Sequence, residues 1–169
     1  NLESERMDKR VDRGRDKLFE QGLRLRKRVL GAAYVERQFE NADAFSLPMQ
    51  VLATKSAWGM VWSRPGLPRK VRSMLNIAML VALGRAEELE LHLDGALRNG
   101  VTKKEIAEVL LQSAIYCGYP AALGGFRTAR DAAGLRRLHQ GGNGQVGEGR
   151  PGVRRESRVR QNIEDVSFV

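Results

Sequence analysis

Cysteine and histidine are scarce in this sequence, which limits the metal and redox chemistry open to the protein. Its 169 residues include one cysteine, Cys117, and two histidines, His92 and His139. A single cysteine excludes an intramolecular disulfide and a CxxC pair, and it fits a reducing compartment. Zinc needs three or four ligands, and neither an HExxH motif nor a second histidine on the same helix accompanies His92. We therefore predict no metal site.

Long apolar runs are also missing, so membrane insertion is not expected. The most apolar stretch, residues 77–83 (IAMLVAL), is too short to span a bilayer. The first residues are charged and lack the apolar segment of a secretory signal. The sequence therefore predicts a cytoplasmic protein without a membrane partner.

Positive charge is concentrated near the two ends of the chain, whose net charge is +9. Lys and Arg outnumber Asp and Glu by ten to six in residues 1–30 and by seven to four in residues 136–169. In residues 31–135 the ratio is only twelve to ten. A nucleic-acid interface would more naturally carry its basic stripe on a folded element. We therefore do not expect a dedicated nucleic-acid-binding module.

Apolar periodicity predicts an all-α fold, a bundle of about six helices. No segment shows the sustained two-residue alternation that is typical of strands. The expected helices cover approximately residues 13–40, 43–62, 68–83, 87–99, 102–116 and 120–138. Pro48 lies near the start of the second helix, which therefore begins at Leu47 or is kinked there. Thr102 and Glu105 form a capping box at the start of the fifth helix, and Gly100 ends the fourth as a left-handed cap.

The chain is predicted to have three parts, of which only the middle one folds. Residues 1–12 form a flexible N-terminus, residues 13–139 a helical domain, and residues 140–169 a disordered basic tail. The stretch GGNGQVGEGRPG (residues 141–152) contains too little apolar surface to pack. His139 lies at the edge of this tail and is a poor candidate for a catalytic residue.

The helix expected over residues 68–83 combines an apolar body with a basic start. Apolar side chains surround its last three turns, which predicts a buried central helix. Arg69, Lys70 and Arg72 lie in its first turn, where positive charge opposes the helix dipole. Their position indicates either solvent exposure or an anionic ligand, and we favour an acidic small molecule.

Glu88 and His92 lie one helical turn apart, at the same edge of the apolar stripe that begins at Leu89 and Leu93. On the helix surface such a pair contributes only about 0.2–0.5 kcal/mol. At the edge of a partly desolvated cleft, the same pair could carry out acid–base chemistry. The pattern by itself leaves both interpretations open.

Three further residues have two interpretations each. Trp58 and Trp62 are four residues apart, so they form a packing stripe or one wall of a pocket. Cys117 closes an apolar helix, where a lone cysteine is more often a small buried apolar residue than a nucleophile.

Several separated blocks of the sequence resemble the carboxymuconolactone decarboxylase family, over about residues 30–135. These blocks are LGAAYVERQFENADAF, WGMVWSRPGL, RSMLNIAMLVAL, ELELHLDGALRNGVTKKEI and EVLLQSAIYCGYPAA, in the family's order and spacing. The resemblance implies an all-α subunit that assembles as a trimer or a hexamer. The wider superfamily includes alkylhydroperoxidase D-like proteins, whose two active-site cysteines would fall on Arg85 and Glu88. Because neither is a cysteine, thiol peroxidase chemistry is not expected.

The implied reaction is the cofactor-free decarboxylation of 4-carboxymuconolactone to 3-oxoadipate enol-lactone, in the breakdown of aromatic compounds such as protocatechuate. From its chemistry we expect His92 to act as hydrogen-bond donor and general acid. Glu88 would fix the tautomer of the imidazole or relay its proton. Arg72, together with Arg85, would hold the carboxylates of this dicarboxylate lactone. The substrate-binding residues expected are Arg72, Arg85, Trp58 and Trp62.

Two alternatives stay open. The protein could be a decarboxylase of this family that acts on a different lactone or keto acid, because pocket residues diverge faster than a scaffold. It could also be a non-catalytic oligomeric binding protein, whose basic tail contacts nucleic acid or an acidic partner.

Overall fold

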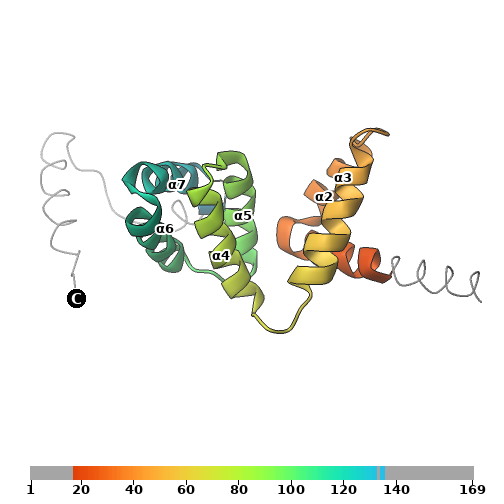
Figure 1. Ribbon diagram of the computed structural model, residues 1–169, viewed down its shortest axis with the longest axis horizontal. Helices are drawn as coiled ribbons and strands as arrows, with labels where there is room; N and C mark the ends of the chain where they lie inside the picture. The colour runs from red at the N-terminus through yellow and green to blue at the C-terminus, as the bar shows by residue number, and fades with distance from the viewer. Residues whose placement is uncertain (1–16, 133, 136–169) are drawn as a thin grey trace, which may run out of the picture. The chain divides into compact units, whose positions relative to one another are not determined.

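The computed structural model describes residues 17–132 and 134–135, and this part of the chain is helical with short connections (Figure 1). After a helix over residues 17–30, the elements are α2 (Ala32–Glu40), α3 (Leu47–Ala53), η1 (Thr54–Trp62), α4 (Arg69–Ala82), α5 (Ala86–Arg98), α6 (Lys103–Cys117) and α7 (Tyr119–Asp131). No strand occurs among the described residues, which confirms the all-α prediction. None of the helices described is both long enough and apolar enough to cross a membrane. The predictions for residues 1–12 and 140–169 lie outside the described residues.

The first expected helix is interrupted at Gly31. This glycine has φ 97° and ψ 136°, a left-handed conformation that a residue with a side chain rarely adopts. Lys27 before the turn forms an ion pair with Glu36 after it, at 2.8 Å. Arg98 of α5 donates a hydrogen bond from Nη1 to the carbonyl of Val29 at 3.0 Å, which satisfies a backbone acceptor beside the break. The prediction of one helix over residues 13–40 is therefore wrong.

The second expected helix is divided into two kinds of helix. α3 begins at Leu47 with Pro48 in its first turn, as one of the two expected alternatives had it. From Thr54 the chain continues as η1, a π-helix of nine residues, where an α-helix was expected. π-Helical segments are rare and often occur at functional sites. With the break at Gly31, this division explains why the fold has more helical elements than the six predicted.

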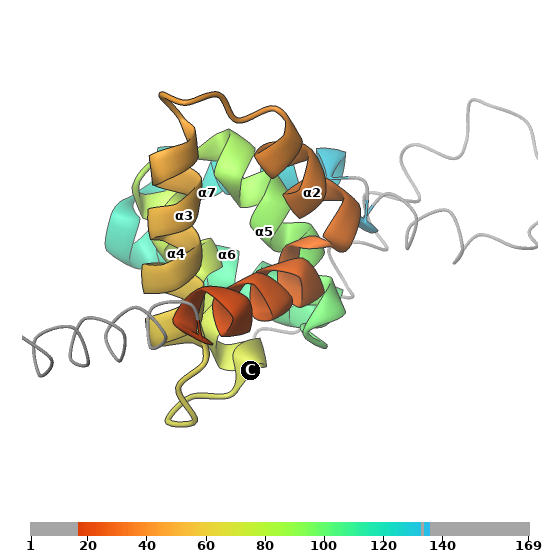
Figure 2. The same ribbon diagram turned by 90° about the vertical axis from the view of Figure 1, so that its right-hand side faces the viewer.

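Two glycines allow the helix over residues 17–30 to cross η1 at very short range (Figure 2). A Cβ atom on Gly22 would lie 2.8 Å from the backbone nitrogen of Gly59 and would also collide with the carbonyl oxygen of Thr54. A Cβ on Gly59 would lie 2.5 Å from the carbonyl oxygen of Leu18. Since the obstacles are backbone atoms, no side-chain rotation could relieve these contacts. The position of η1 thus depends on both glycines.

Arg26 connects the same helix to α3 and η1, and it has no carboxylate partner among the described residues. Its Nη1 donates to Thr54 Oγ1 at 2.9 Å, and its Nη2 donates to Gln50 Oε1 at 2.8 Å. The side chain is almost completely buried, and this burial lowers the pKa of the guanidinium. Sequence reasoning did not single out Arg26, because its partners lie more than twenty residues away along the chain.

Helices α4 to α7 lie side by side and bury one apolar core (Figure 1). The largest side chains of that core with almost no exposure are Ile77, Leu93, Ile106 and Leu110. A second, smaller cluster joins the N-terminal helices to η1, and its buried members are Val29, Leu30, Val35, Trp58 and Trp62. Leu91 of α5 packs against the second cluster, so α5 contributes to both.

The start of α6 has the predicted capping box. The side chain of Thr102 accepts a hydrogen bond from the amide of Glu105 at 3.2 Å, and Glu105 Oε2 accepts one from the amide of Thr102 at 2.8 Å. Lys70 of α4 pairs with Glu105 at 2.7 Å and so ties the two helices together. The bond to Lys70, followed by those to Thr102, lowers the pKa of Glu105 to about 2. The predicted left-handed residue Gly100 is also present, with φ 83°.

Two expectations about the bundle are wrong. α4 is not buried all round: Ile77 and Val81 are buried, whereas 47% of Leu75 and 53% of Met79 are exposed. An apolar face of α4 therefore has no cover within the described residues. α7 ends at Asp131, because the backbone becomes extended at Ala132 (ψ 134°), so the expected helix is interrupted there. Residues 134–135 are helical again, and residues 136–138 of the expected helix lie outside the described residues.

Candidate functional site around His92

His92 lies where the sequence predicted, beside the buried stripe of α5. Leu89 and Leu93 are buried in the core, and the imidazole is half-buried at its edge. This burial lowers the pKa of His92 below its ordinary value of 6.5. The negative charge of Glu88 acts in the opposite direction and raises the pKa, but it is the smaller effect. His92 is therefore mainly neutral at neutral pH.

Two neighbours set the orientation of the imidazole ring. Trp58 of η1 stacks beside it, with the ring centres 6.4 Å apart and the planes only 6° from parallel. Asn76 of α4 places its Nδ2 3.4 Å from His92 Nδ1. When Asn76 donates to Nδ1, the proton of the neutral ring is on Nε2. Nε2–H is then available as a donor to a ligand.

Asn76 is a site residue that sequence reasoning missed. It is the one polar side chain between Met74 and Leu83, in the middle of an otherwise apolar stretch. A polar group placed among apolar ones normally has a specific hydrogen-bond partner. That signal was available in the sequence, although it did not identify His92 as the partner.

Glu88 is exposed, one turn before His92 on the same helix. It lies close enough to affect the pKa of the imidazole through its charge. The structure thus brings the two members of the predicted pair together, with one at the surface and the other partly buried.

The π-helix η1 supplies the aromatic side of the site. Trp58 and Trp62 are both buried, and their ring centres are 4.8 Å apart with the planes tilted by 33°. Because Trp58 also contacts His92, the three rings form a continuous aromatic series from α5 to the end of η1. Both tryptophans are therefore packing residues, and Trp58 also borders a titratable side chain.

The two arginines predicted to bind substrate differ in burial and in hydrogen bonding. Arg72 lies one turn before Asn76 on α4, and its Nη2 donates to the carbonyl of Arg64 at 3.1 Å. Its Nε is buried and has no partner among the described residues. Arg85 is exposed and immediately precedes α5, three residues before Glu88. An unpartnered buried donor is unusual, and a bound carboxylate would satisfy it.

The predicted burial of Cys117 is wrong, because the last residue of α6 is exposed. Its exposure follows from its place at the end of α6, where Gly118 (φ 89°) redirects the chain. Within residues 17–132 and 134–135, no three His, Cys, Asp or Glu side chains gather closely enough to hold a metal ion. For the chain as a whole, the absence of a metal stays a prediction, and so does the absence of a cofactor.

Comparisons with known proteins agree on one family. The sequence profile of the carboxymuconolactone decarboxylase family matches residues 50–131, which include Trp58, Asn76, Glu88 and His92. Over 107 residues the chain is 48% identical to a nitrosuccinic acid decarboxylase from Metarhizium robertsii, covering 63% of this chain and 75% of that protein. Over 104 residues it is 48% identical to a 4-carboxymuconolactone decarboxylase from Acinetobacter baylyi, covering 62% of this chain and 78% of that protein.

Proposed function

The chain belongs to the carboxymuconolactone decarboxylase family, and we propose that it decarboxylates 4-carboxymuconolactone to 3-oxoadipate enol-lactone at the site around His92. This proposal rests on the position of His92 between Trp58 and Asn76, within the residues that the family profile matches. This setting provides a neutral imidazole with a directed N–H donor, in a partly desolvated position.

The substrate supplies its own electron sink, so the reaction needs no pyridoxal or thiamine cofactor. When the carboxylate leaves C4 of the lactone ring as carbon dioxide, its bonding pair moves through the ring double bond onto the lactone carbonyl. A dienolate forms, and the carbon beside the carbonyl then takes up one proton. The enzyme must therefore stabilise a developing oxyanion, deliver a proton and hold two carboxylates.

His92 is suited to the first two tasks. Its lowered pKa keeps the ring neutral, and the contact of Asn76 with Nδ1 leaves Nε2–H to donate to the dienolate oxygen. In this proposal the imidazole takes up a second proton as the dienolate forms, relayed from solvent through exposed Glu88 one turn away. The resulting imidazolium delivers one proton to the ring carbon and so returns to the neutral form. The charge of Glu88 favours the transient imidazolium and so opposes the effect of burial.

Arg72 and Arg85 are proposed to hold the two carboxylates. The buried Nε of Arg72 lacks a partner among the described residues, and the side chain lies on the same side of α4 as Asn76. Arg85 lies next to the start of the helix that carries Glu88 and His92. Arg72, which is partly buried, would bind the carboxylate that stays on the product. Arg85, which is exposed, would guide the other carboxylate of the substrate into the site.

A second substrate deserves a direct comparison, because the chain is as similar to a nitrosuccinic acid decarboxylase as to a 4-carboxymuconolactone decarboxylase. Nitrosuccinate is also a dicarboxylate, and loss of the carboxylate next to its nitro-bearing carbon would send the bonding pair onto the nitro group. A neutral N–H donor and two arginines would serve that reaction in the same way. A different lactone or keto acid is a further alternative.

Purified protein mixed with freshly made 4-carboxymuconolactone tests the proposal, with turnover followed by ultraviolet absorbance and by carbon dioxide release. Nitrosuccinate is assayed in parallel, and the ratio of the two kcat/KM values assigns the substrate. H92Q keeps a polar side chain but cannot carry a proton, so turnover should fall by roughly 10²–10⁴-fold. H139Q changes the chain's other histidine and should have no effect. Normal turnover by H92Q would refute the assignment, and no decarboxylation at all would favour a binding protein.

Assembly into a trimer or a hexamer is also proposed. α4 and its C-cap residue expose apolar side chains at four-residue intervals, which form one continuous apolar face: Val71, Leu75, Met79 and Leu83. α6 adds Leu111 and Ile115, both more than half exposed. Apolar faces of this extent are typical of subunit interfaces. They explain why the sequence of α4 has the pattern of a fully buried helix.

A further inference from the structure

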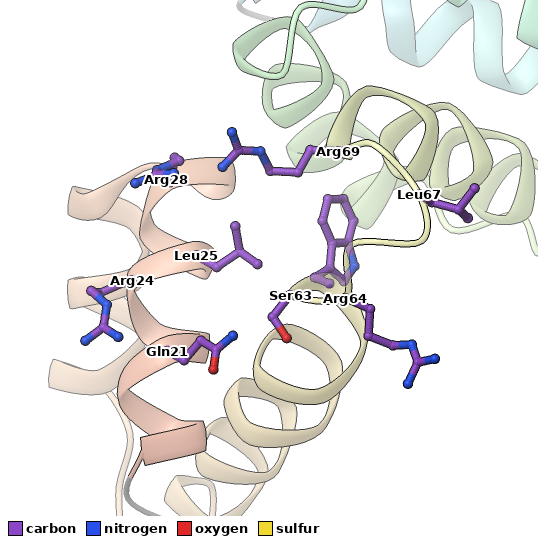
Figure 3. A pocket seen from close by; sticks show the side chains of 9 residues that line it. Gln21, Arg24, Leu25, Arg28, Ser63, Arg64, Leu67 and Arg69 are labelled. Atoms are coloured by element: carbon purple, nitrogen blue, oxygen red, sulfur yellow. The ribbon is translucent and has the colours of Figure 1, made fainter.

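A pocket of about 340 Å³ lies between the helix over residues 17–30 and the segment that joins η1 to α4 (Figure 3). It is not the site around His92, since Trp62 is the only one of the aromatic series that borders it. Its polar lining includes Gln21, Arg24, Arg28, Ser63, Arg64 and Arg69. Four of its nine lining residues are therefore arginines, and none is acidic.

The two walls of the pocket bring these charges together from distant parts of the sequence. On the first wall, Gln21, Arg24 and Arg28 recur at three- and four-residue intervals, so they share one face of their helix. On the second wall, Arg64 belongs to the connection after η1, and Arg69 is the first residue of α4. The chain thus assembles a positively charged concavity where the charges repel one another.

Most of this charge has no counter-charge in the part of the chain that the structure describes. Arg24 has Glu20 at 3.9 Å, an exposed pair on one helix that contributes little. No carboxylate among the described residues pairs with Arg28, Arg64 or Arg69. Arg69 also lies at a helix start, where the dipole disfavours a cation. A bound anion would relieve both the repulsion and the dipole effect.

The direction of the Arg69 side chain indicates which arginines lie nearest to such a ligand. In Figure 3, Arg69 extends from α4 toward the helix on which Arg28 lies, whereas Arg24 and Arg64 extend outward from their walls. Because Arg28 lines the pocket from the helix that Arg69 approaches, these two arginines are placed to contact the ligand from opposite sides. Trp62 and Leu25 supply an apolar floor for a carbon skeleton. The volume is at the lower end of the range for small-molecule sites.

We propose that this pocket is a second ligand site, which binds a small polyanion carrying two or more carboxylate or phosphate groups. Guanidinium forks on two walls favour planar or tetrahedral oxyanions that can accept several hydrogen bonds at once. A single carboxylate would contact only one wall. The half of the pocket formed by residues 21–28 lies outside residues 50–131, the segment matched by the family profile. The site is independent of the reaction at His92.

Calorimetric titration of the full-length chain at constant ionic strength tests the proposal, with citrate and pyrophosphate as separate probes and acetate as the single-charge control. Saturable binding at one site per chain is expected for at least one probe, and the tighter probe distinguishes carboxylate from phosphate chemistry. Acetate should bind at least about tenfold more weakly, because it can engage only one wall. Absence of saturable binding by both probes at millimolar concentration would overturn the proposal.

Variants then locate the site. R28Q and R69Q should each weaken binding by about tenfold or more, the usual effect of losing a hydrogen bond to a charged group. R127Q removes an exposed arginine of α7 that does not line the pocket, and it should bind normally. H92Q should also bind normally, which separates this site from the decarboxylation site. Unchanged binding by R28Q and R69Q, or equal weakening by R127Q, would contradict the assignment.

Discussion

Replacing Gly22 by alanine should disrupt the fold at the point that positions the two tryptophans. The new Cβ would lie 2.8 Å from the backbone nitrogen of Gly59 and closer still to the carbonyl oxygen of Thr54. Real Cβ atoms essentially never approach other heavy atoms so closely. Since the helix over residues 17–30 and η1 both meet here through their backbones, one of them must move.

The expected magnitude follows from two opposing effects. Overpacking a tight core lowers stability by about 1–3 kcal/mol and occasionally more. Because the new Cβ would collide with two backbone groups, we expect a cost at or above the upper end of that range. In a helix, alanine is favoured over glycine by about 0.8–1 kcal/mol, which offsets part of the cost. G22A should therefore lose roughly 2–3 kcal/mol of stability. For a chain of this length, this corresponds to a fall in Tm of about 4–12 °C.

Thermal unfolding at a fixed protein concentration, followed by circular dichroism, provides the measurement. G124A is the matched control: Gly124 lies inside α7, and a Cβ there would meet nothing within 4 Å. The same substitution should raise stability at this position by up to about 1 kcal/mol. Near-ultraviolet circular dichroism should also change in G22A, because η1 carries both tryptophans. If G22A were as stable as G124A, the close crossing described above would be wrong.

The neutral form of His92 should be the active one, so kcat/KM should be constant through neutral pH and fall in acid, below 6.5. Glu88 raises the pKa of His92, so E88Q should move this acidic limb to lower pH, and an unchanged limb would exclude the interaction. Glu105 has its pKa lowered from 4.5 to about 2, so its contribution to stability is complete above 4.5 and is lost as the pH falls toward 2. E105Q should therefore have a lower Tm than the wild type at neutral pH, with the difference disappearing near pH 2; a constant difference would contradict its bond to Lys70. L75E places a charge on the exposed apolar face of α4 and should reduce the mass measured by light scattering, whereas an unchanged mass would place the interface elsewhere.

Local sequence was sufficient for the all-α class, for α5 and α6, and for the position of the catalytic candidates on α5. The capping box at Thr102 and the left-handed glycine at Gly100 involve only residues within one turn of each other, so the sequence shows them directly. The buried stripe through Leu89 and Leu93 likewise follows from the period of the α-helix. For that reason the partly buried setting of His92 could be predicted.

The same local signals did not predict the structure where the sequence is compatible with two similar local structures. Apolar residues continue in phase through Gly31, and they do not reveal that the backbone turns there. The sequence of η1 contains no local signal that distinguishes i→i+5 from i→i+4 hydrogen bonding, so the π-helix could not be recognised. The pattern of α4 indicated burial, but it could not indicate that part of this surface has no partner within the described residues.

Contacts between distant segments were decided only by the tertiary structure. Asn76 reaches His92 from sixteen residues away, and Arg26 reaches Thr54 from twenty-eight. The arginine pocket likewise joins Arg28 with Arg69, whose separation in sequence carries no signal of proximity. Periodicity determines which face of a helix is apolar, whereas the packing of helices determines which polar side chains meet. The composition of the candidate sites therefore depends on how the helix over residues 17–30, η1, α4 and α5 are placed against one another.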